Sequence, residues 1–280
     1  MNKQGNADNP KGGIEWTHFF GPRTGYTANP VRGCEHRCEW EMPDGHIARC
    51  YAKDVAEGIA RAAYPKGFEH VSFHSEELAA IGRLETPAGI FIDSMSDLFG
   101  QSVNKFWIDA TIQCLRDNPQ HVYFSLTKNP TRFREFTAEN KPWPANWLVG
   151  ISAPPTFMFG KKLDATMQRA WLKRGLEFLR DSPAQLRWIS IEPLSFDIAP
   201  ILAASDCPLD FAVIGAASRG AITYQPDRIH FWNALQVLKC PVFFKGNLSR
   251  NLAIQVAGSW REEFPKVTTT PKTVAAPELF

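Results

Sequence analysis

Short apolar runs alternate with amphipathic stretches along most of the chain. Runs of this length, most of them rich in Ile, Val and Phe, are typical of buried strands. Two intervening stretches, Lys105–Asp117 and Ala165–Arg180, carry apolar residues at helical spacing and predict helices. The predicted strands are Thr27–Arg32, Gly89–Ser94, Val122–Thr127, Trp147–Ser152, Leu186–Ile191, Phe211–Gly215 and Pro241–Lys245.

Strands that alternate with helices over a whole chain predict a parallel sheet covered by outer helices. Six or seven such units are fewer than the eight that close a TIM barrel. The pattern therefore predicts an α/β fold, a partial (β/α)6-7 TIM-like barrel, as one domain over residues 14–266. Residues 1–13 and 267–280 lack core-forming periodicity and are expected to be a disordered leader and a loose tail.

Polar residues or glycine follow almost every predicted strand. In open α/β sheets and barrels the carboxyl ends of the strands form the active-site face, so these residues are expected to converge on one site. They are Asn29, Asp93, Ser94, Ser96, Asp97, Ser125, Lys128, Ser152, Glu192, Gly215 and Lys245.

Composition adds two limits. Thirty-one basic and 29 acidic residues give a formal charge of +2, which is not the signature of a dedicated nucleic-acid binder but allows a local basic patch. No apolar run is long enough to span a membrane, and the polar N-terminus does not look like a signal peptide. We therefore expect no membrane association and a cytoplasmic location, where thiols stay reduced.

Three of the six cysteines, Cys34, Cys38 and Cys50, lie within 17 residues directly after the first predicted strand. Three thiolates can hold a 4Fe–4S cluster and leave one iron open for another ligand, whereas electron-transfer clusters usually take four. Zinc held by the three cysteines and by His36 or His46 is the alternative. The remaining cysteines, which are expected to be small buried core residues, are Cys114, Cys207 and Cys240.

The cysteine loop, GCEHRCEWEMPDGHIARCYA, resembles the cluster loop of a family of phage proteins that is similar to the radical S-adenosylmethionine (SAM) superfamily. Six further segments match that family in order, so the resemblance spans roughly residues 14–250. They are Ile14–Thr17 with Asn29-Pro30, Ser94–Phe99, Leu126–Pro130, Gly150–Ser152, Ser190–Leu194, and Ile214-Gly215 with Phe243–Lys245.

The chain departs from the family pattern in two places. The usual radical SAM loop is C-x3-C-x2-C, but eleven residues separate Cys38 from Cys50 here. An insertion between two ligands is tolerable because loop closure costs only about 0.6 kcal/mol per doubling of loop length. At Gly215–Ser218 the chain reads GAAS, where the family often carries GGES.

The resemblance implies a 4Fe–4S cluster on Cys34, Cys38 and Cys50, with SAM bound to the open iron. Reductive cleavage of SAM would give a 5′-deoxyadenosyl radical that takes a hydrogen from the substrate. The residues expected to bind the cofactor are Tyr51, Asp93, Ser94, Ser96, Ser125, Lys128, Ser152, Glu192 and Gly215. Asp97 and Lys245 are candidate substrate contacts, and Trp16, Trp40 and Phe99 are candidates for stacking on a base. The alternatives are a salt bridge inside the barrel for Glu192 and a surface lysine for Lys245.

The substrate follows only from the resemblance. It implies a DNA base as partner, a modified or hypermodified thymine, with flavodoxin or ferredoxin as electron donor and the host cytoplasm as the location if a phage encodes the chain. Radical modification of RNA or of a peptide is a second hypothesis. A zinc-binding nucleic-acid module without redox chemistry is a third, and the oligomeric state is not predicted.

Overall fold

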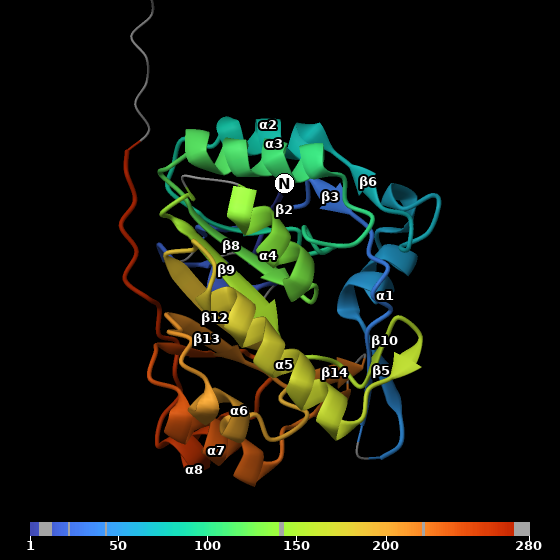
Figure 1. Ribbon diagram of the computed structural model, residues 1–280, viewed down its shortest axis with the longest axis vertical. Helices are drawn as coiled ribbons and strands as arrows, with labels where there is room; N and C mark the ends of the chain where they lie inside the picture. Colours follow the sequence, from blue (N-terminus) through green and yellow to red (C-terminus); the bar gives the residue numbers. More distant parts are fainter. Residues whose placement is uncertain (6–12, 22, 43, 140–142, 220–221, 272–280) are drawn as a thin grey trace, which may run out of the picture.

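The computed structural model describes residues 1–5, 13–21, 23–42, 44–139, 143–219 and 222–271. Its main element is a curved eight-stranded sheet with the order β1-β2-β7-β8-β9-β12-β13-β16 (Figure 1). Neighbouring strands are parallel, except that β1 is antiparallel to β2. The strands are β1 (Asn2–Lys3), β2 (Gly25–Ala28), β7 (Gly89–Ile92), β8 (Val122–Thr127), β9 (Trp147–Ser152), β12 (Leu186–Ile191), β13 (Phe211–Ile214) and β16 (Val242–Phe244).

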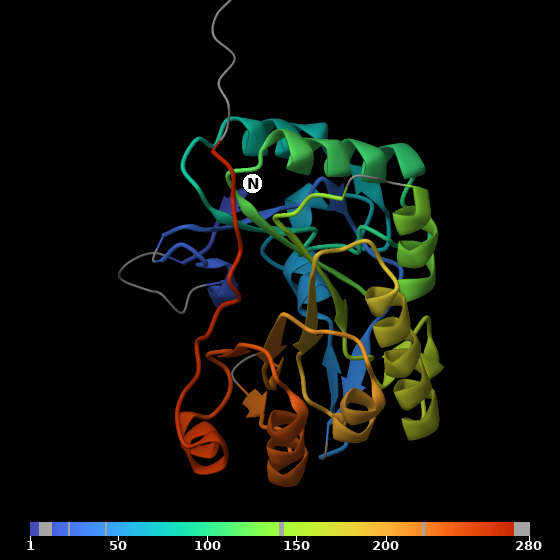
Figure 2. The ribbon, with the colours of Figure 1, turned by 60° about the vertical axis from the view of Figure 1, so that its left-hand side comes forward.

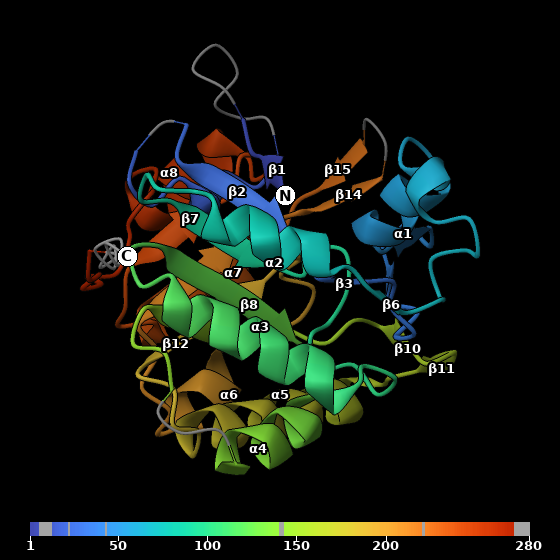
Figure 3. The same ribbon diagram turned by 90° about the horizontal axis from the view of Figure 1, so that it is seen from above.

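Helices cover the outer side of this sheet (Figures 1 and 3). They are α2 (Ser75–Gly82), α3 (Lys105–Asp117), α4 (Pro130–Glu139), α5 (Ala165–Arg180), α6 (Ala199–Ala204), α7 (Arg228–Val237) and α8 (Arg250–Ala257). The remaining helix, α1 (Tyr51–Glu57), lies near the carboxyl ends of the strands. The predicted partial barrel with outer helices is therefore confirmed. Among the described residues, no helix has both the length and the apolar character needed to cross a bilayer.

The two faces of the sheet carry separate cores, because successive residues of a strand point to opposite sides. On β7, Ile90 and Ile92 pack outward into the large core under the helices, while Phe91 points into the lumen of the half-barrel. The lumen core consists of Trp16, Phe91, Val122, Phe124, Leu148, Trp188, Phe211, Val213 and Phe243. These side chains, most of them aromatic, fill the lumen below the carboxyl ends of the strands. The space at the carboxyl ends themselves is not filled by this core.

Several predicted boundaries are confirmed residue for residue, including β8, β9, β12, α3 and α5. The first predicted strand, Thr27–Arg32, is wrong in one respect, because the chain breaks at Asn29-Pro30. Proline cannot donate a ladder hydrogen bond, and the chain leaves β2 there to form β3 (Val31–Arg32), which pairs with β6 (Ser72–Phe73).

The two predicted terminal segments fall partly outside the described residues, 6–12 in the leader and 272–280 in the tail. In the leader, Asn2 and Lys3 form β1 at the edge of the sheet. In the tail, Val267 packs against the lumen core, and Thr270 N donates to Pro119 O at 3.2 Å. Figure 2 shows this C-terminal segment running past the sheet from α8 toward α3.

Candidate active site

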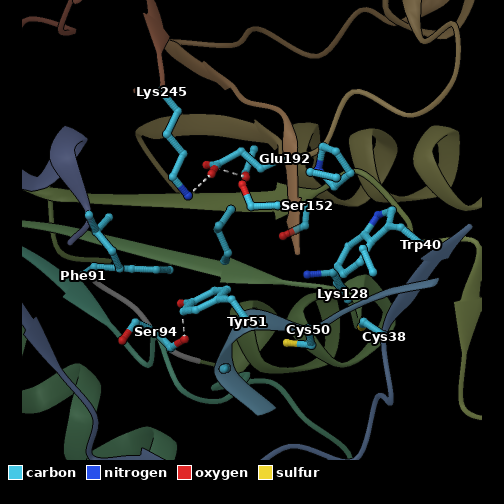
Figure 4. Close-up of a pocket in the computed structure, with 18 of the residues that line it drawn as sticks. Cys38, Trp40, Cys50, Tyr51, Phe91, Ser94, Lys128, Ser152, Glu192 and Lys245 are labelled. Carbon is cyan, nitrogen blue, oxygen red and sulfur yellow. Dashed lines mark hydrogen bonds and ion pairs between the residues drawn. The ribbon is translucent and has the colours of Figure 1, made fainter. Parts of the chain in front are cut away.

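A cavity of about 600 Å³ opens at the carboxyl ends of the strands. Figure 4 shows cysteine side chains on one side of it and Glu192 and Lys245 on the other. Most of the predicted site residues line it, which is the convergence that the strand-end pattern predicts. They are Cys34, Cys38, Cys50, Tyr51, Asp93, Ser94, Ser96, Asp97, Lys128, Ser152, Glu192 and Lys245.

Between Cys38 and Cys50, β4 (Glu39–Glu41) and β5 (Ile47–Arg49) pair as a hairpin. Trp40 pairs with Ala48 in this hairpin, and Cys50 N donates to Cys38 O at 3.1 Å. The two cysteines are therefore cross-strand neighbours at the open end of the hairpin. The insertion lengthens the loop without separating its ends, which explains how the chain tolerates it.

The hairpin is part of a small sheet with the order β11-β10-β4-β5, in which β10 is Phe157–Met158 and β11 is Lys161–Lys162. Met158 packs with Cys38, Trp40 and Ala48 in a separate apolar cluster that also includes Ala217 of β14 (Ala217–Arg219), a strand paired with β15 (Ile222–Tyr224). The pairs β4–β5, β10–β11 and β14–β15 thus support one wall of the cavity together. Trp40 lines this wall.

Gly33 fixes the first cysteine. Its φ of +92° is left-handed, and an added Cβ would lie 2.3 Å from His70 O, so only glycine fits there. The next residue, Cys34, donates its backbone N–H to Phe68 O at 2.9 Å. The backbone of Gly33 and Cys34 is therefore held against the 68–70 loop.

Two of the three thiols, those of Cys34 and Cys38, lie in a buried environment that favours their neutral form. Burial raises the pKa of Cys34 above its usual range, and the Asp97 carboxylate adds to this. Burial also raises the pKa of Cys38 to about 12, against a lowering by the Lys128 ammonium. A thiol binds metal as the thiolate, so bound cationic iron would supply the positive charge that these sites need.

Among the described residues, no three His, Cys, Asp or Glu side chains are arranged to hold a metal ion. A single tetrahedral zinc needs sulfurs about 3.8 Å apart, since Zn–S bonds are about 2.3 Å long. A 4Fe–4S cluster binds each cysteine through a different iron and so accepts more widely spaced thiols. Three thiols that line one cavity are donors that both a 4Fe–4S cluster and a zinc ion use, and the cluster is taken up below as a proposal.

Asp97 ties the cysteine loop to the end of β8. Its Oδ2 accepts from Thr127 Oγ1 at 3.0 Å and from Lys128 N at 2.8 Å, while Oδ1 accepts from Phe99 N at 2.9 Å. His36 Nδ1 lies 3.6 Å from the same Oδ2. Although Asp97 lines the cavity, these contacts engage both carboxylate oxygens, so the geometry favours a positioning role over a substrate contact.

Asn29 and Val31, at the break between β2 and β3, form hydrogen bonds that hold the turn after β7. Asn29 Oδ1 accepts from Ser94 Oγ at 3.1 Å and from Met95 N at 2.9 Å. Asp93 has a φ of +60° and accepts from Val31 N at 2.9 Å through Oδ1, whereas its Oδ2 is buried and has no hydrogen-bond partner among the described residues. A strained, buried carboxylate with an unused oxygen is typical of a binding site.

Tyr51 begins α1 directly after the third cysteine. Its hydroxyl donates to Ser94 O at 2.5 Å, and Figure 4 shows its ring between Ser94 and Cys50. Half of the side chain is exposed, on the cavity side, which leaves one ring face available for stacking.

On the opposite wall, Lys245 Nζ lies 2.6 Å from Glu192 Oε2, and Ser190 Oγ donates to Glu192 Oε1 at 3.2 Å. The salt bridge considered for Glu192 is therefore present, but it lies at the cavity surface and not in the sealed core. Burial lowers the pKa of Lys245, but the Glu192 and Glu15 carboxylates outweigh it and raise that pKa overall. Ser152, whose backbone is paired with that of Ser190, lines the same wall.

Two predicted residues are not brought to the cavity wall. Ser125 points to the outer face of the sheet, away from the lumen, where its hydroxyl accepts from Trp147 Nε1 at 2.9 Å. Gly215 lies behind the wall, where an added Cβ would be 3.1 Å from Glu192 Cγ. Of the stacking candidates, Trp16 and Trp40 line the cavity, whereas Phe99 is fully buried against Phe133. The three scattered cysteines pack partly buried against the main core, outside the cavity wall: Cys114, Cys207 and Cys240.

The cavity residues that sequence reasoning missed include Glu15 and Asn247. Glu15 lies in η1 (Glu15–Thr17), and its Oε2 accepts from Gly246 N at 2.6 Å. Asn247 Oδ1 accepts from Ala216 N, and its Nδ2 donates to Ala216 O at 2.7 Å. The sequence signal for Glu15 was the Ile14–Thr17 motif, to which no role was given. Asn247 had no such signal, because it lies two residues beyond the end of the predicted strand Pro241–Lys245.

Fold and site together define a half-barrel α/β protein with a strand-end cavity that carries three cysteines. The chain belongs to the family described as "Protein of unknown function (DUF5131)", whose model matches residues 11–234. A search of curated proteins found no match.

Two solved structures of spore photoproduct lyase are similar to the chain, one with dinucleoside spore photoproduct and one a mutant with bound AdoMet and the same dinucleoside. Sequence identity is 10% in both, with TM-scores of 0.42 and 0.43. The similarity covers 67% and 70% of this chain and 54% and 57% of those structures. The chain thus spans little more than half of their length.

Proposed function

We propose that the chain is a radical SAM enzyme whose cluster is held by Cys34, Cys38 and Cys50. The observation that carries the proposal is the hairpin that returns Cys50 to Cys38 at the wall of the strand-end cavity, beside Cys34. When bound, a 4Fe–4S cluster would pass one electron from flavodoxin or ferredoxin to SAM, which would split into methionine and a 5′-deoxyadenosyl radical that takes a hydrogen atom from the substrate.

The residues of this chain would bind, orient and shield these reactants. Asp93 and Ser94 are proposed to bind SAM at the end of β7, next to the ring of Tyr51. Lys128 contributes positive charge beside all three thiols. Glu192 and Ser152 offer oxygen acceptors on the far wall, and the lumen rings below exclude water from the floor of the cavity.

The substrate is proposed to be a modified thymine in DNA, in keeping with the family resemblance of the cysteine loop. RNA and peptides are the alternative substrates, and the test must distinguish them from DNA. DNA oligonucleotides with modified thymine, RNA of the same sequence and a peptide mixture would be compared for substrate-dependent formation of 5′-deoxyadenosine, with DNA binding followed against salt.

The test of the class uses four single Ala variants after anaerobic reconstitution with iron and sulfide. Replacement of Cys34, Cys38 or Cys50 is expected to lower bound iron and to abolish formation of 5′-deoxyadenosine from SAM. Cys114→Ala is the matched control, because it removes a thiol from the main core, and should retain both. Full iron content in a variant of the first three would contradict its assignment as a ligand.

A further inference from the structure

The wall of the cavity opposite the thiols carries charged side chains, and of these the proposed cofactor binding uses only Glu192. Glu15, Glu192 and Lys245 line it together, two carboxylates against one ammonium. Figure 4 shows Lys245 and Glu192 on this wall, across the cavity from Cys50 and Cys38. We call these three residues the carboxylate end of the cavity.

The lysine and one carboxylate of this set neutralise each other. Lys245 Nζ lies 2.6 Å from Glu192 Oε2, and the other oxygen of Glu192 accepts from Ser190 Oγ. Both oxygens of Glu192 therefore have partners. The carboxylate end retains one negative charge in excess, and that charge belongs to Glu15.

Glu15 is held in place by the backbone of a distant segment. Its Oε2 accepts from Gly246 N at 2.6 Å, and an added Cβ on Gly246 would lie 2.3 Å from Oε1 and 3.0 Å from Cδ. The carboxylate therefore packs flat against the glycine that follows Lys245. Within the described part of the chain, no hydrogen-bond donor or ion-pair partner reaches Oε1.

This arrangement leaves a partly buried acceptor. Burial raises the pKa of the Glu15 carboxylate above its usual value, and the Gly246 hydrogen bond and Lys245 reverse only part of that rise. A carboxylate in such a place gains most from a ligand that brings both a hydrogen-bond donor and a positive charge. Protonated amines combine the two.

We infer that the carboxylate end binds a positively charged nitrogen group of the substrate, with Glu15 Oε1 as its acceptor. The inference rests on the proposed function, because it takes the group to belong to the molecule whose reacting carbon faces the thiol side. Glu15 would be a specificity-determining residue. One role of the Ile14–Thr17 motif would be to position its carboxylate at this wall.

The test compares two nucleosides of nearly equal shape, 5-aminomethyl-2′-deoxyuridine and 5-hydroxymethyl-2′-deoxyuridine, by calorimetric titration of the reconstituted protein with SAM present. The amine is expected to bind at least about tenfold tighter than the alcohol, because hydrogen bonds between charged groups are the stronger ones. Glu15→Gln keeps the acceptor for Gly246 N and should remove this preference. Gly246→Ala should also remove it, by displacing the carboxylate.

Glu76→Gln is the control, because Glu76 is exposed on α2 and its loss changes the net charge equally. It should keep the preference. An amine that binds no tighter than the alcohol, or not at all, overturns the inference, and so does a Glu15→Gln variant that weakens SAM binding and leaves the amine preference intact. Formation of 5′-deoxyadenosine is measured in the same samples. Its absence together with a preserved amine preference would refute the proposed reaction and not the carboxylate end.

Discussion

The lumen core predicts a large effect of a small substitution, Gly150→Ala on β9. An added Cβ would lie 2.5 Å from Trp188 Nε1 and 2.6 Å from its Cδ1, against about 3.5–4.0 Å for normal contacts. The indole must therefore move by about 1 Å. It is fully buried and has Trp16 and Phe124 around it, with ring centroids at 4.9 and 5.9 Å.

The same movement strains the hydrogen bonds of the indole. Trp188 Nε1 donates to Ser125 O at 3.0 Å and to Leu148 O at 3.1 Å. Overpacking a core costs about 1–3 kcal/mol, and leaving a buried donor unsatisfied costs about 1–3 kcal/mol. The loss of chain entropy from the unfolded state offsets about 0.4–1 kcal/mol. We expect Gly150→Ala to lower the free energy of unfolding by about 3 kcal/mol, or the melting temperature by roughly 6–12 °C.

Urea unfolding at 25 °C, followed by circular dichroism, measures this change. Gly82→Ala is the matched control, since an added Cβ there meets nothing within 4 Å, and it should unfold at or above the wild-type midpoint. Trp188→Phe should restore part of the loss in the Gly150→Ala background. An unchanged midpoint for Gly150→Ala would refute the packing argument.

Three further predictions concern the cavity. Asp97→Ala leaves three donors without their acceptor, so the free energy of unfolding should fall by about 3 kcal/mol in urea titrations, with bound iron also reduced. Lys245→Ala leaves Glu192 without its cation, so adding Glu192→Gln to that variant should recover stability in a double-mutant cycle. Replacing residues 42–46 with an Asn-Gly turn should retain iron because Glu41 still pairs with Ile47 and Cys38 with Cys50, and loss of iron would contradict the hairpin account.

The sequence predicted the sheet well because its signal is local. Each inner strand reads as a short apolar run that ends in polar residues, and β8, β9 and β12 match their predicted bounds. The break after β2 was missed because Asn29-Pro30 lies inside an otherwise continuous strand pattern. Only the hydrogen bonds of Asn29 to the turn after β7 show why the chain bends there.

The cavity was predicted less completely, because successive side chains of a strand point to opposite faces of the sheet and only one face leads to the cavity. Ser125 and Lys128 both lie near the end of β8, yet Ser125 bonds to Trp147 on the outer face of the sheet whereas Lys128 lines the cavity. Glu15 was missed because its partner, Gly246, lies 231 residues away in the sequence. A contact of that range leaves no pattern in either segment.

The central claim, that the three-cysteine loop holds a 4Fe–4S cluster that SAM binds, is tested most directly by electron paramagnetic resonance. The protein would be purified without oxygen, reconstituted with iron and sulfide, reduced, and measured with and without SAM. The account predicts a 4Fe–4S signal that changes when SAM is added, with 5′-deoxyadenosine formed in the same sample. A colourless protein that retains one zinc and cleaves no SAM would contradict it.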